Sequence, residues 1–330
     1  MSIKNGMKGS TKMIAMIVVI VVVVSAIGAI EYEHISGSGK GRIITVDSNV
    51  SGVHLNRIIS LDPAASATLY AIGAFKDVLG KGPYTTYPKS NLPNMTCYPD
   101  MSVEQIVNLS PDAVISFSSY PPSEVQELLN ASIDYIFLSA GINSTFSQIM
   151  QQNILLGELT GNQNNATLLN NWMKESLNQF SNVSVVNKTL LYAMCVENGA
   201  TWTTGKGTFV NAMFNYSHLN NIANGSGFYE ISNENIVNSN PQVILLGTCF
   251  NQSDLDREPF DSTSAYKNNT IYTAFDTNLF SEPNFRNIFA IEWLIYNVYH
   301  VTVKLPEFPF NLQYNPEPTQ VQSIYEDVNV

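Results

Sequence analysis

The sequence contains few of the residues on which many secreted and catalytic proteins depend. Only 3 of its 330 residues are cysteine, so a dense disulfide framework is excluded and a hydrophobic core must supply the stability. Charged residues make up 13% of the chain, and the formal net charge is −11. This shortage of basic residues excludes the cationic surface that nucleic-acid binding requires.

Two of the cysteines, Cys195 and Cys249, each follow an apolar run in the second half of the chain. Such runs are typical of strands, and neighbouring strand ends bring side chains together. A disulfide between Cys195 and Cys249 and a pair of buried free thiols are both compatible with this pattern.

Residues for catalysis are also scarce. The 4 histidines have no HExxH or paired spacing, so no ligand set for a zinc hydrolase is visible. The segment Gly199 to Gly207 resembles a phosphate loop, but Gly207 stands where Ser or Thr should follow Lys206. The acids Asp62, Glu197 and Asp276 are far apart in sequence, and hard cations need several converging oxygens. We therefore predict no catalytic residues, no metal site and no resident cofactor.

The N-terminus carries a membrane signal. Three lysines precede an uninterrupted apolar or small run from Met13 to Ile30, which Glu31 and Glu33 end. As a helix this run would cover ~27 Å, close to a bilayer core, with its basic side in the cytoplasm. It exceeds the usual hydrophobic region of a cleaved signal, so we favour an uncleaved anchor over a signal peptide. The chain that follows is then extracytoplasmic, and its 12 Asn-x-Ser/Thr sequons suit that location.

Beyond a Gly/Ser tether, short apolar runs alternate with segments of helical spacing. This alternation predicts parallel sheets covered on both faces, arranged as two Rossmann-like α/β lobes. The predicted strands are 57–61, 78–80, 113–117, 135–138, 190–195, 243–247 and 271–274, and the predicted helices are 64–72, 103–109, 123–130, 209–215, 234–237 and 285–299.

A long amphipathic helix is predicted between the lobes, within Asn153 to Val183. Its apolar residues recur at helical spacing, and Asn170, Asn171, Lys174 and Glu175 are expected to face water. One helical connector predicts only a small rotation of the lobes on binding. The predicted domains are a basic tail (1–12), a membrane or signal segment (13–30), a linker (31–41), an N-terminal lobe (42–160), the interlobe helix (161–183) and a C-terminal lobe (184–330).

Several segments occur in an order that resembles one family, the substrate-binding proteins of ABC importers for iron-siderophores and cobalamin. They are RIISLDPAASATLYAIGA (57–74), SVEQIVNLSPDAVI (102–115), NILLGELTG (153–161), GKGTFVNAM (205–213), ENIVNSNPQVILL (234–246), KNNTIY (267–272) and SEPNFR (281–286). One departure is Ala67, which follows Ser66 where the family usually has glutamate.

The resemblance implies a permease partner and a ligand such as a ferric siderophore, haem or cobalamin. Relatives present one acid on each lobe to arginines of the permease. The nearest matches here are Glu104 on the first lobe and Glu234 or Glu230 on the second. The alternative for each is an ordinary solvated helix face.

Ligands of open parallel sheets bind beyond the carboxyl ends of the strands. The loops predicted there carry aromatic side chains and one main cation, which suit a large, partly apolar ligand with an anionic edge. The candidate ligand-binding residues are Tyr84, Tyr120, Trp202, Phe250, Phe280 and Arg286. For Phe250 and Phe280 a place in the core is equally compatible, and for Arg286 a salt bridge to Glu282 or another nearby acid is the alternative.

We therefore predict a monomeric, membrane-tethered, extracytoplasmic solute-binding protein. Two other classes of protein remain as alternatives. A cell-surface adhesion or glycan-binding protein would also suit the tether and the sequons, although the chain shows no repeats beyond the two lobes. A surface hydrolase is less favoured because no catalytic cluster is visible.

Overall fold

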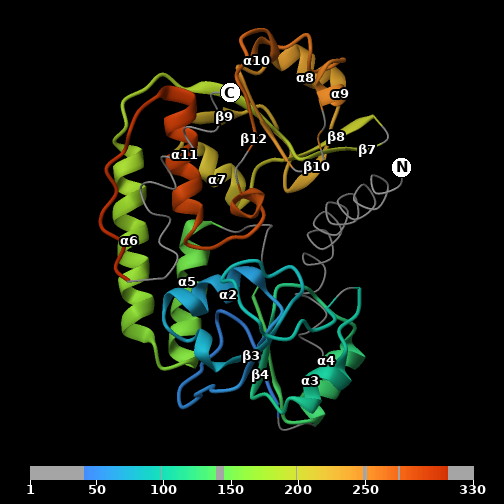
Figure 1. Ribbon diagram of the computed structural model, residues 1–330, viewed down its shortest axis with the longest axis vertical. Helices are drawn as coiled ribbons and strands as arrows, with labels where there is room; N and C mark the ends of the chain where they lie inside the picture. Colours follow the sequence, from blue (N-terminus) through green and yellow to red (C-terminus); the bar gives the residue numbers. More distant parts are fainter. Residues whose placement is uncertain are drawn as a thin grey trace.

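A computed structural model describes residues 41–97, 99–138, 145–197, 199–247, 250, 252–273 and 276–310. These residues form two α/β lobes, one above the other in Figure 1, with helices α5, α6, α7 and α11 along one flank. The predicted membrane or signal segment lies outside the described residues. Within them, no helix is long and apolar enough to cross a membrane.

The first lobe is built on a five-stranded parallel sheet in the order β1-β5-β4-β2-β3. Its strands are β1 (Ile43–Ile44), β2 (Ile58–Ser60), β3 (Val78–Lys81), β4 (Ala113–Ser116) and β5 (Asp134–Phe137). The helices between them are α2 (Pro63–Ala71), α3 (Val103–Asn108) and α4 (Pro122–Asn130), with a 3-10 turn η2 (Phe75–Asp77) before β3. The predicted elements of this lobe are confirmed.

Successive residues of each strand enter different hydrophobic layers. In β4, Ala113 and Ile115 face the layer that contains α2, while Val114 faces the layer that contains α3 and α4. Burial on both faces explains why these strands read as continuous apolar runs instead of an alternating pattern. The carboxyl ends of the strands are therefore the part of the sheet left for polar loops.

The second lobe contains a four-stranded parallel sheet in the order β12-β11-β6-β9. Its strands are β6 (Lys188–Ala193), β9 (Leu219–Asn221), β11 (Val243–Leu246) and β12 (Ile271–Thr273). The helices are α7 (Phe209–Tyr216), α8 (Asn233–Ser239), α9 (Gln252–Leu255), α10 (Ser264–Lys267) and α11 (Asn287–Tyr299), with the turn η3 (Thr277–Phe280) before α11. Again, Leu245 and Ile244 face opposite layers.

A second, antiparallel sheet corrects one of the loops predicted at the strand ends, the one that carries Trp202. It consists of β7 (Cys195–Glu197), β8 (Ala200–Thr204) and β10 (Phe228–Ile231), in the order β10-β8-β7. Glu197 pairs with Ala200, which leaves two residues for the turn, and Gly199 has φ +84°. The sequence pair Asn198-Gly199 is itself a strong hairpin signal, and it was not used in the prediction.

The connector consists of two helices, α5 (Phe146–Leu159) and α6 (Gln163–Ser181). The break falls at Gly161, whose φ of +68° suits glycine after a helix end. The 19 residues of α6 span ~28 Å, so the predicted interlobe helix is confirmed. The prediction that Asn170 faces water is wrong. Asn170 accepts a hydrogen bond from Asn153 Nδ2 (2.9 Å) and donates one to Met150 O (2.8 Å), which ties α6 to α5.

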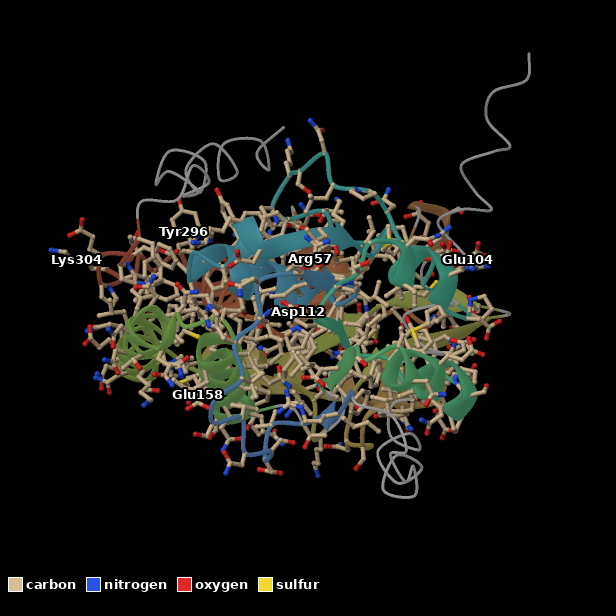
Figure 2. All side chains as sticks on the ribbon, turned by 90° about the horizontal axis from the view of Figure 1, so that it is seen from below. Arg57, Glu104, Asp112, Glu158, Tyr296 and Lys304 are labelled. Carbon is tan, nitrogen blue, oxygen red and sulfur yellow. The ribbon has the colours of Figure 1, made fainter. Side chains whose placement is uncertain are left out.

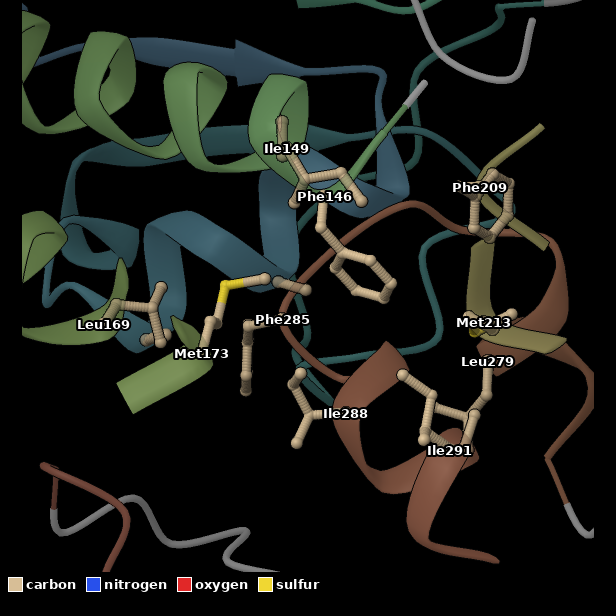
Figure 3. Close-up of a cluster of buried hydrophobic side chains, with 14 of the residues drawn as sticks. Phe146, Ile149, Leu169, Met173, Phe209, Met213, Leu279, Phe285, Ile288 and Ile291 are labelled. Atoms are coloured by element: carbon tan, nitrogen blue, oxygen red, sulfur yellow. The ribbon is translucent and has the colours of Figure 1, made fainter. Parts of the chain in front are cut away.

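One hydrophobic layer runs through both lobes, and we call it the shared apolar layer. In Figure 3, side chains of α5, α6, α7 and α11 converge in it. Phe146 comes from α5 and Met173 from α6, while Met213 and Ile288 come from the second lobe. All four are buried. The lobes are thus joined by packed helices as well as by the covalent connector.

The segment after α11 strengthens this flank. Trp172 in α6 donates from Nε1 to the carbonyl of Pro306 (3.1 Å), and its ring lies edge-on to Phe308 at a centroid distance of 4.8 Å. Phe308 in turn stacks on Phe285 at 5.6 Å. Residues 300–310 therefore lie against the interlobe helix and the start of α11.

Candidate ligand cleft and lobe contact

The carboxyl edges of the two parallel sheets face each other. The loop after β3 carries Thr86, and the segment after β12 carries Asn278, whose Nδ2 donates to Thr86 Oγ1 at 2.8 Å. Since these segments follow strands of different lobes, the lobes meet through loops at strand ends. This is where ligands of open α/β sheets bind.

On the first lobe, Asp62 follows β2 and caps α2. Its Oδ1 accepts from the backbone N–H of Ala64 (2.7 Å), and Pro63 occupies the first position of the helix. Burial raises the pKa of Asp62 to about 6, against the opposing effect of hydrogen bonds from the Ala65 and Ala64 N–H groups. The hydrogen bond to the first turn of α2 fixes the Asp62 carboxyl group at the contact between the lobes.

On the second lobe, asparagines fold the segment between β12 and α11. Asn284 Oδ1 accepts from the N–H of Arg286 (2.9 Å), and Asn287 Oδ1 accepts from the N–H of Asn284 (2.9 Å). Asn287 Nδ2 donates to the carbonyls of Leu279 (2.8 Å) and Glu282 (3.0 Å). These bonds satisfy backbone groups at the start of α11 and fix where Glu282 and Arg286 point.

Arg286 occupies the N-cap position of α11, where a cation opposes the helix dipole. Its Nη2 donates to Asp276 Oδ2, and its Cζ lies 4.5 Å from the centroid of the Tyr87 ring of the first lobe. The side chain is 8% exposed. Of the two roles weighed for Arg286, the structure supplies the partner for the internal salt bridge, with Asp276 as the acid. In this conformation Arg286 joins the lobes.

Glu282 is the least satisfied group of this contact. It is 8% exposed, and within the described residues its Oε2 has no hydrogen-bond partner. Arg286 Nη1 lies 3.9 Å from it, too far for a hydrogen bond. Burial raises the pKa of Glu282 to about 8; Arg286 opposes the shift, and Asp276 and Asp62 add to it. Of the three acids that are far apart in sequence, two, Asp62 and Asp276, are close enough to Glu282 to raise its pKa.

Two of the predicted ligand-binding aromatics are buried. Tyr120 donates from its hydroxyl to the carbonyl of Cys97 (2.6 Å) inside the first lobe. Phe280 lies in the shared apolar layer against Tyr192 and Trp293. Both fill the core because aromatic residues near strand ends also close the hydrophobic layers. In this conformation they belong to the core, which for Phe280 is the alternative given above.

Tyr84, Trp202 and Phe250 are half-buried at the edges of their lobes. Tyr84 packs against the α3/α4 layer, and Phe250 lies edge-on to Phe260 at 5.5 Å. Trp202 is in β8, directly opposite Cys195 on β7 and Glu230 on β10, so these three side chains share one face of the antiparallel sheet. Cys249 lies outside the described residues, so neither the disulfide between Cys195 and Cys249 nor the alternative of two buried free thiols is tested.

The predicted docking acids fall into two settings. Glu104 is exposed in the first turn of α3, at the outer rim of the first lobe in Figure 2, and Glu234 is exposed in the first turn of α8. Glu230 instead lies on β10 beside Trp202. Of the two second-lobe candidates, Glu234 is therefore the structural counterpart of Glu104.

A repeat that the sequence analysis missed explains this match. Ser102-x-Glu104-x-Ile-Val-Asn recurs as Ser232-x-Glu234-x-Ile-Val-Asn. Both serines cap their helices, and each helix is followed within two residues by one with positive φ, Ser110 (46°) or Asn240 (43°), just before a central strand. Each copy also exposes a valine, Val107 (38%) and Val237 (42%). The two lobes thus present the same small surface, an acid beside an apolar side chain.

Within the described residues, no group of three or more His, Cys, Asp or Glu side chains could hold a metal ion. The chain has two α/β lobes with parallel sheets, whose strand ends face each other and which a long helix joins. This architecture is that of a bilobal binding protein. The periplasmic binding protein family matches residues 58–276, more than half of the chain, and the chain belongs to this family.

Individual relatives agree with this assignment. The chain is 27% identical over 259 residues to an uncharacterized ABC transporter substrate-binding lipoprotein of Bacillus subtilis, covering 75% of this chain and 81% of that protein. It is 24% identical over 254 residues to a cobalamin-binding protein of Halobacterium salinarum, covering 73% and 67%. The structure matches the periplasmic haem-binding protein HutB of Vibrio cholerae with a TM-score of 0.67 at 18% identity, covering 74% of this chain and 98% of that one. These relatives are binding proteins, and the predicted fold class is confirmed.

Proposed function

We propose that the chain is the extracytoplasmic solute-binding component of an ABC importer, and that it carries a metal chelate or a corrinoid in the cleft between its lobes. Membership of the periplasmic binding protein family is the observation that carries this proposal. Relatives named for cobalamin and haem support the ligand class. The same membership argues against the adhesion and hydrolase alternatives.

The half-buried aromatics support a broad, partly apolar ligand. Tyr84 from the first lobe, and Trp202 and Phe250 from the second, are the remaining candidates from the sequence. Trp202 is the strongest of them, because its Nε1 is buried and has no hydrogen-bond partner within the described residues. A ligand that supplies an acceptor to this N–H would remove the cost of leaving it unpaired.

Binding titrations test this proposal directly. The purified protein is titrated with cobalamin, haem and ferric siderophores, after native mass spectrometry of protein isolated from its source has shown which ligand is retained. Trp202→Phe keeps an aromatic ring and removes the N–H donor, so it should weaken binding of the retained ligand by about tenfold, which corresponds to about 1.4 kcal/mol. Tyr216→Phe, on the opposite flank of the second lobe, is the control. Failure of all three ligands to bind would contradict the proposed ligand class.

We further propose that the two copies of the repeated surface dock on the permease. Glu104 and Glu234 would pair with cations of the partner, while Val107 and Val237 would contact apolar side chains beside them. A partner with two similar subunits suits this arrangement, since each lobe offers one equivalent patch.

Charge reversal tests the docking role. Glu104→Arg or Glu234→Arg should lower ligand uptake in cells, and the double variant should lower it further, while ligand affinity of the purified protein stays unchanged. Glu127→Arg, an exposed acid on α4 of the same lobe, is the matched control. A loss of ligand affinity in the Glu104 or Glu234 variants would contradict docking and place these acids in the ligand site.

Location completes the proposal. The apolar run at 13–30, with lysines before it, would anchor the chain by its N-terminus and leave both lobes outside the membrane. One relative is a substrate-binding lipoprotein by name, which supports a membrane-anchored, extracytoplasmic location. Protease added to intact cells should release a fragment that carries both lobes and leave the N-terminal peptide with the membrane.

A further inference from the structure

The polar contact between the lobes holds more acids than cations. Asp62 comes from the first lobe, and Asp276 and Glu282 come from the second. Arg286 is the cation among them, and its Nη2 is taken by Asp276. The last residue of β3, Lys81, is a further cation on the first lobe, and its Nζ donates to the carbonyl of Thr85 (2.7 Å). The contact therefore has an unbalanced negative charge when all of its carboxyl groups are ionised.

Geometry assigns that imbalance to Glu282. Its Oε2 is buried and without a hydrogen bond within the described residues, and 3.9 Å separates it from Arg286 Nη1, which is also buried and unbonded. If Glu282 were ionised here, its Oε2 would lose hydration without gaining a hydrogen bond in return. A protonated carboxyl carries no such electrostatic cost. Parting the lobes would return Glu282 to water.

We propose that this contact is a proton-dependent latch, in which the Glu282 carboxyl takes up a proton when the lobes come together and releases it to solvent when they part. The proposal concerns the lobe contact alone and holds for any ligand. The groups that face Glu282 are Asp62 at the start of α2, Asp276 before η3 and Arg286 at the start of α11, with the Tyr87 ring on the far side of Arg286.

The sign of the pH dependence follows from linkage. The pKa of Glu282 is about 8 with the lobes together, and with the lobes apart it returns toward its ordinary value of 4.5. Below the lower value both states are protonated and the contact has its full strength. Between the two values the closed state binds more protons, so the contact weakens as pH rises and levels off above the higher value. Asp62 acts in the same direction over a lower window, from 3.8 to about 6.

Hydrogen–deuterium exchange of the full-length protein in detergent micelles tests the latch between pH 7.5 and 9, well above the pKa of Asp62 of about 6. After correction for base-catalysed exchange, protection of segments 82–89 and 276–287 should fall together. One linked proton changes the opening constant by up to about tenfold per pH unit. Protection of the α6 amides provides the internal reference.

Two variants make the test specific. Glu282→Gln copies the protonated carboxyl, so protection of both segments should stay high and become independent of pH. Glu292→Gln is the matched control, because burial also raises the pKa of Glu292, to about 7, but with no charged group of this contact among the causes. It should keep the wild-type pH dependence. Protection of the two segments that does not change with pH in the wild type would overturn the latch, and this result does not depend on any variant folding. An unchanged pH dependence in Glu282→Gln would overturn it as well.

Discussion

The two lobes meet through two contacts with opposite chemistry. On the flank, helices α5, α6, α7 and α11 pack in the shared apolar layer (Figure 3). At the strand ends the lobes meet through a polar contact of Arg286, Asp276, Glu282 and Tyr87, in which the Oε2 atom of Glu282 has no hydrogen-bond partner within the described residues. Burial of apolar surface does not depend on protonation, whereas the polar contact does. The apolar flank therefore supplies a contact between the lobes that does not depend on pH. The polar contact at the strand ends makes lobe closure depend on pH.

The largest effect should come from the flank. Phe285→Ala removes a buried ring that stacks on Phe308, and a Phe→Ala change of this kind costs about 3–5 kcal/mol of unfolding free energy. Urea unfolding followed by circular dichroism measures the loss, with the exposed Val186→Ala as the control, expected within about 0.5 kcal/mol of wild type. A small loss for Phe285→Ala would show that the flank is not the main contact.

Removing the cation should have the next largest effect. Arg286→Met keeps an unbranched apolar stem but leaves Asp276 without its counter-charge, and we expect a loss of about 2–3 kcal/mol by urea unfolding. Arg257→Met is the matched control, because Arg257 pairs with Asp254 at 2.7 Å on the surface and should contribute less than about 1 kcal/mol. Equal losses for the two variants would mean that the lobe contact is no stronger than a surface ion pair.

A stabilising change comes next. Asp62→Asn keeps the helix cap and cannot ionise. The raised pKa of Asp62 means that wild type loses stability as pH rises from 3.8 through about 6. The variant should therefore be more stable than wild type by about 1–3 kcal/mol at pH 7.5, and the difference should vanish near pH 3.5. Thermal melts across this range measure it, with the exposed Asp47→Asn expected to show no such trend.

The smallest effect should come from Thr86→Ala. It removes the acceptor for Asn278 Nδ2, yet both partners are at the surface, where water replaces the lost bond. We expect a change of no more than about 0.5 kcal/mol in unfolding free energy. A larger loss would move the centre of the polar contact from Arg286 toward this pair.

The sequence predicted the parts of the fold that depend on periodicity. Strands buried on both faces are continuous apolar runs, and α6 has an apolar stripe, so both were visible without coordinates. The antiparallel sheet was missed because Asn198-Gly199 was interpreted as part of a ligand loop. The buried Asn170 was misplaced because its hydrogen-bond partners lie on α5, and periodicity carries no information about partners.

The candidate site was less predictable. The sequence identified Arg286 as a cation in an unfavourable place and named a nearby acid as one explanation, but it could not show that Asp276 is that acid or that Tyr87 covers the guanidinium. It identified Glu282 only as a possible partner, because the raised pKa arises from burial and from Asp62 on the other lobe. The repeat around Glu104 and Glu234 is visible in the sequence. That it marks equivalent surfaces follows only from the structure, in which α3 and α8 each precede a central strand of their lobe's parallel sheet.

The shared apolar layer also determines how the chain can be divided. Boundaries drawn at residues 160 and 184 separate two lobes by topology, but a fragment that ended there would expose the inner faces of α5 or α11 to water. Neither fragment would bury its side of the shared apolar layer. A calorimeter should therefore record a single heat-absorption peak for the whole chain, and each half expressed alone should aggregate, while the two halves produced together should reassemble.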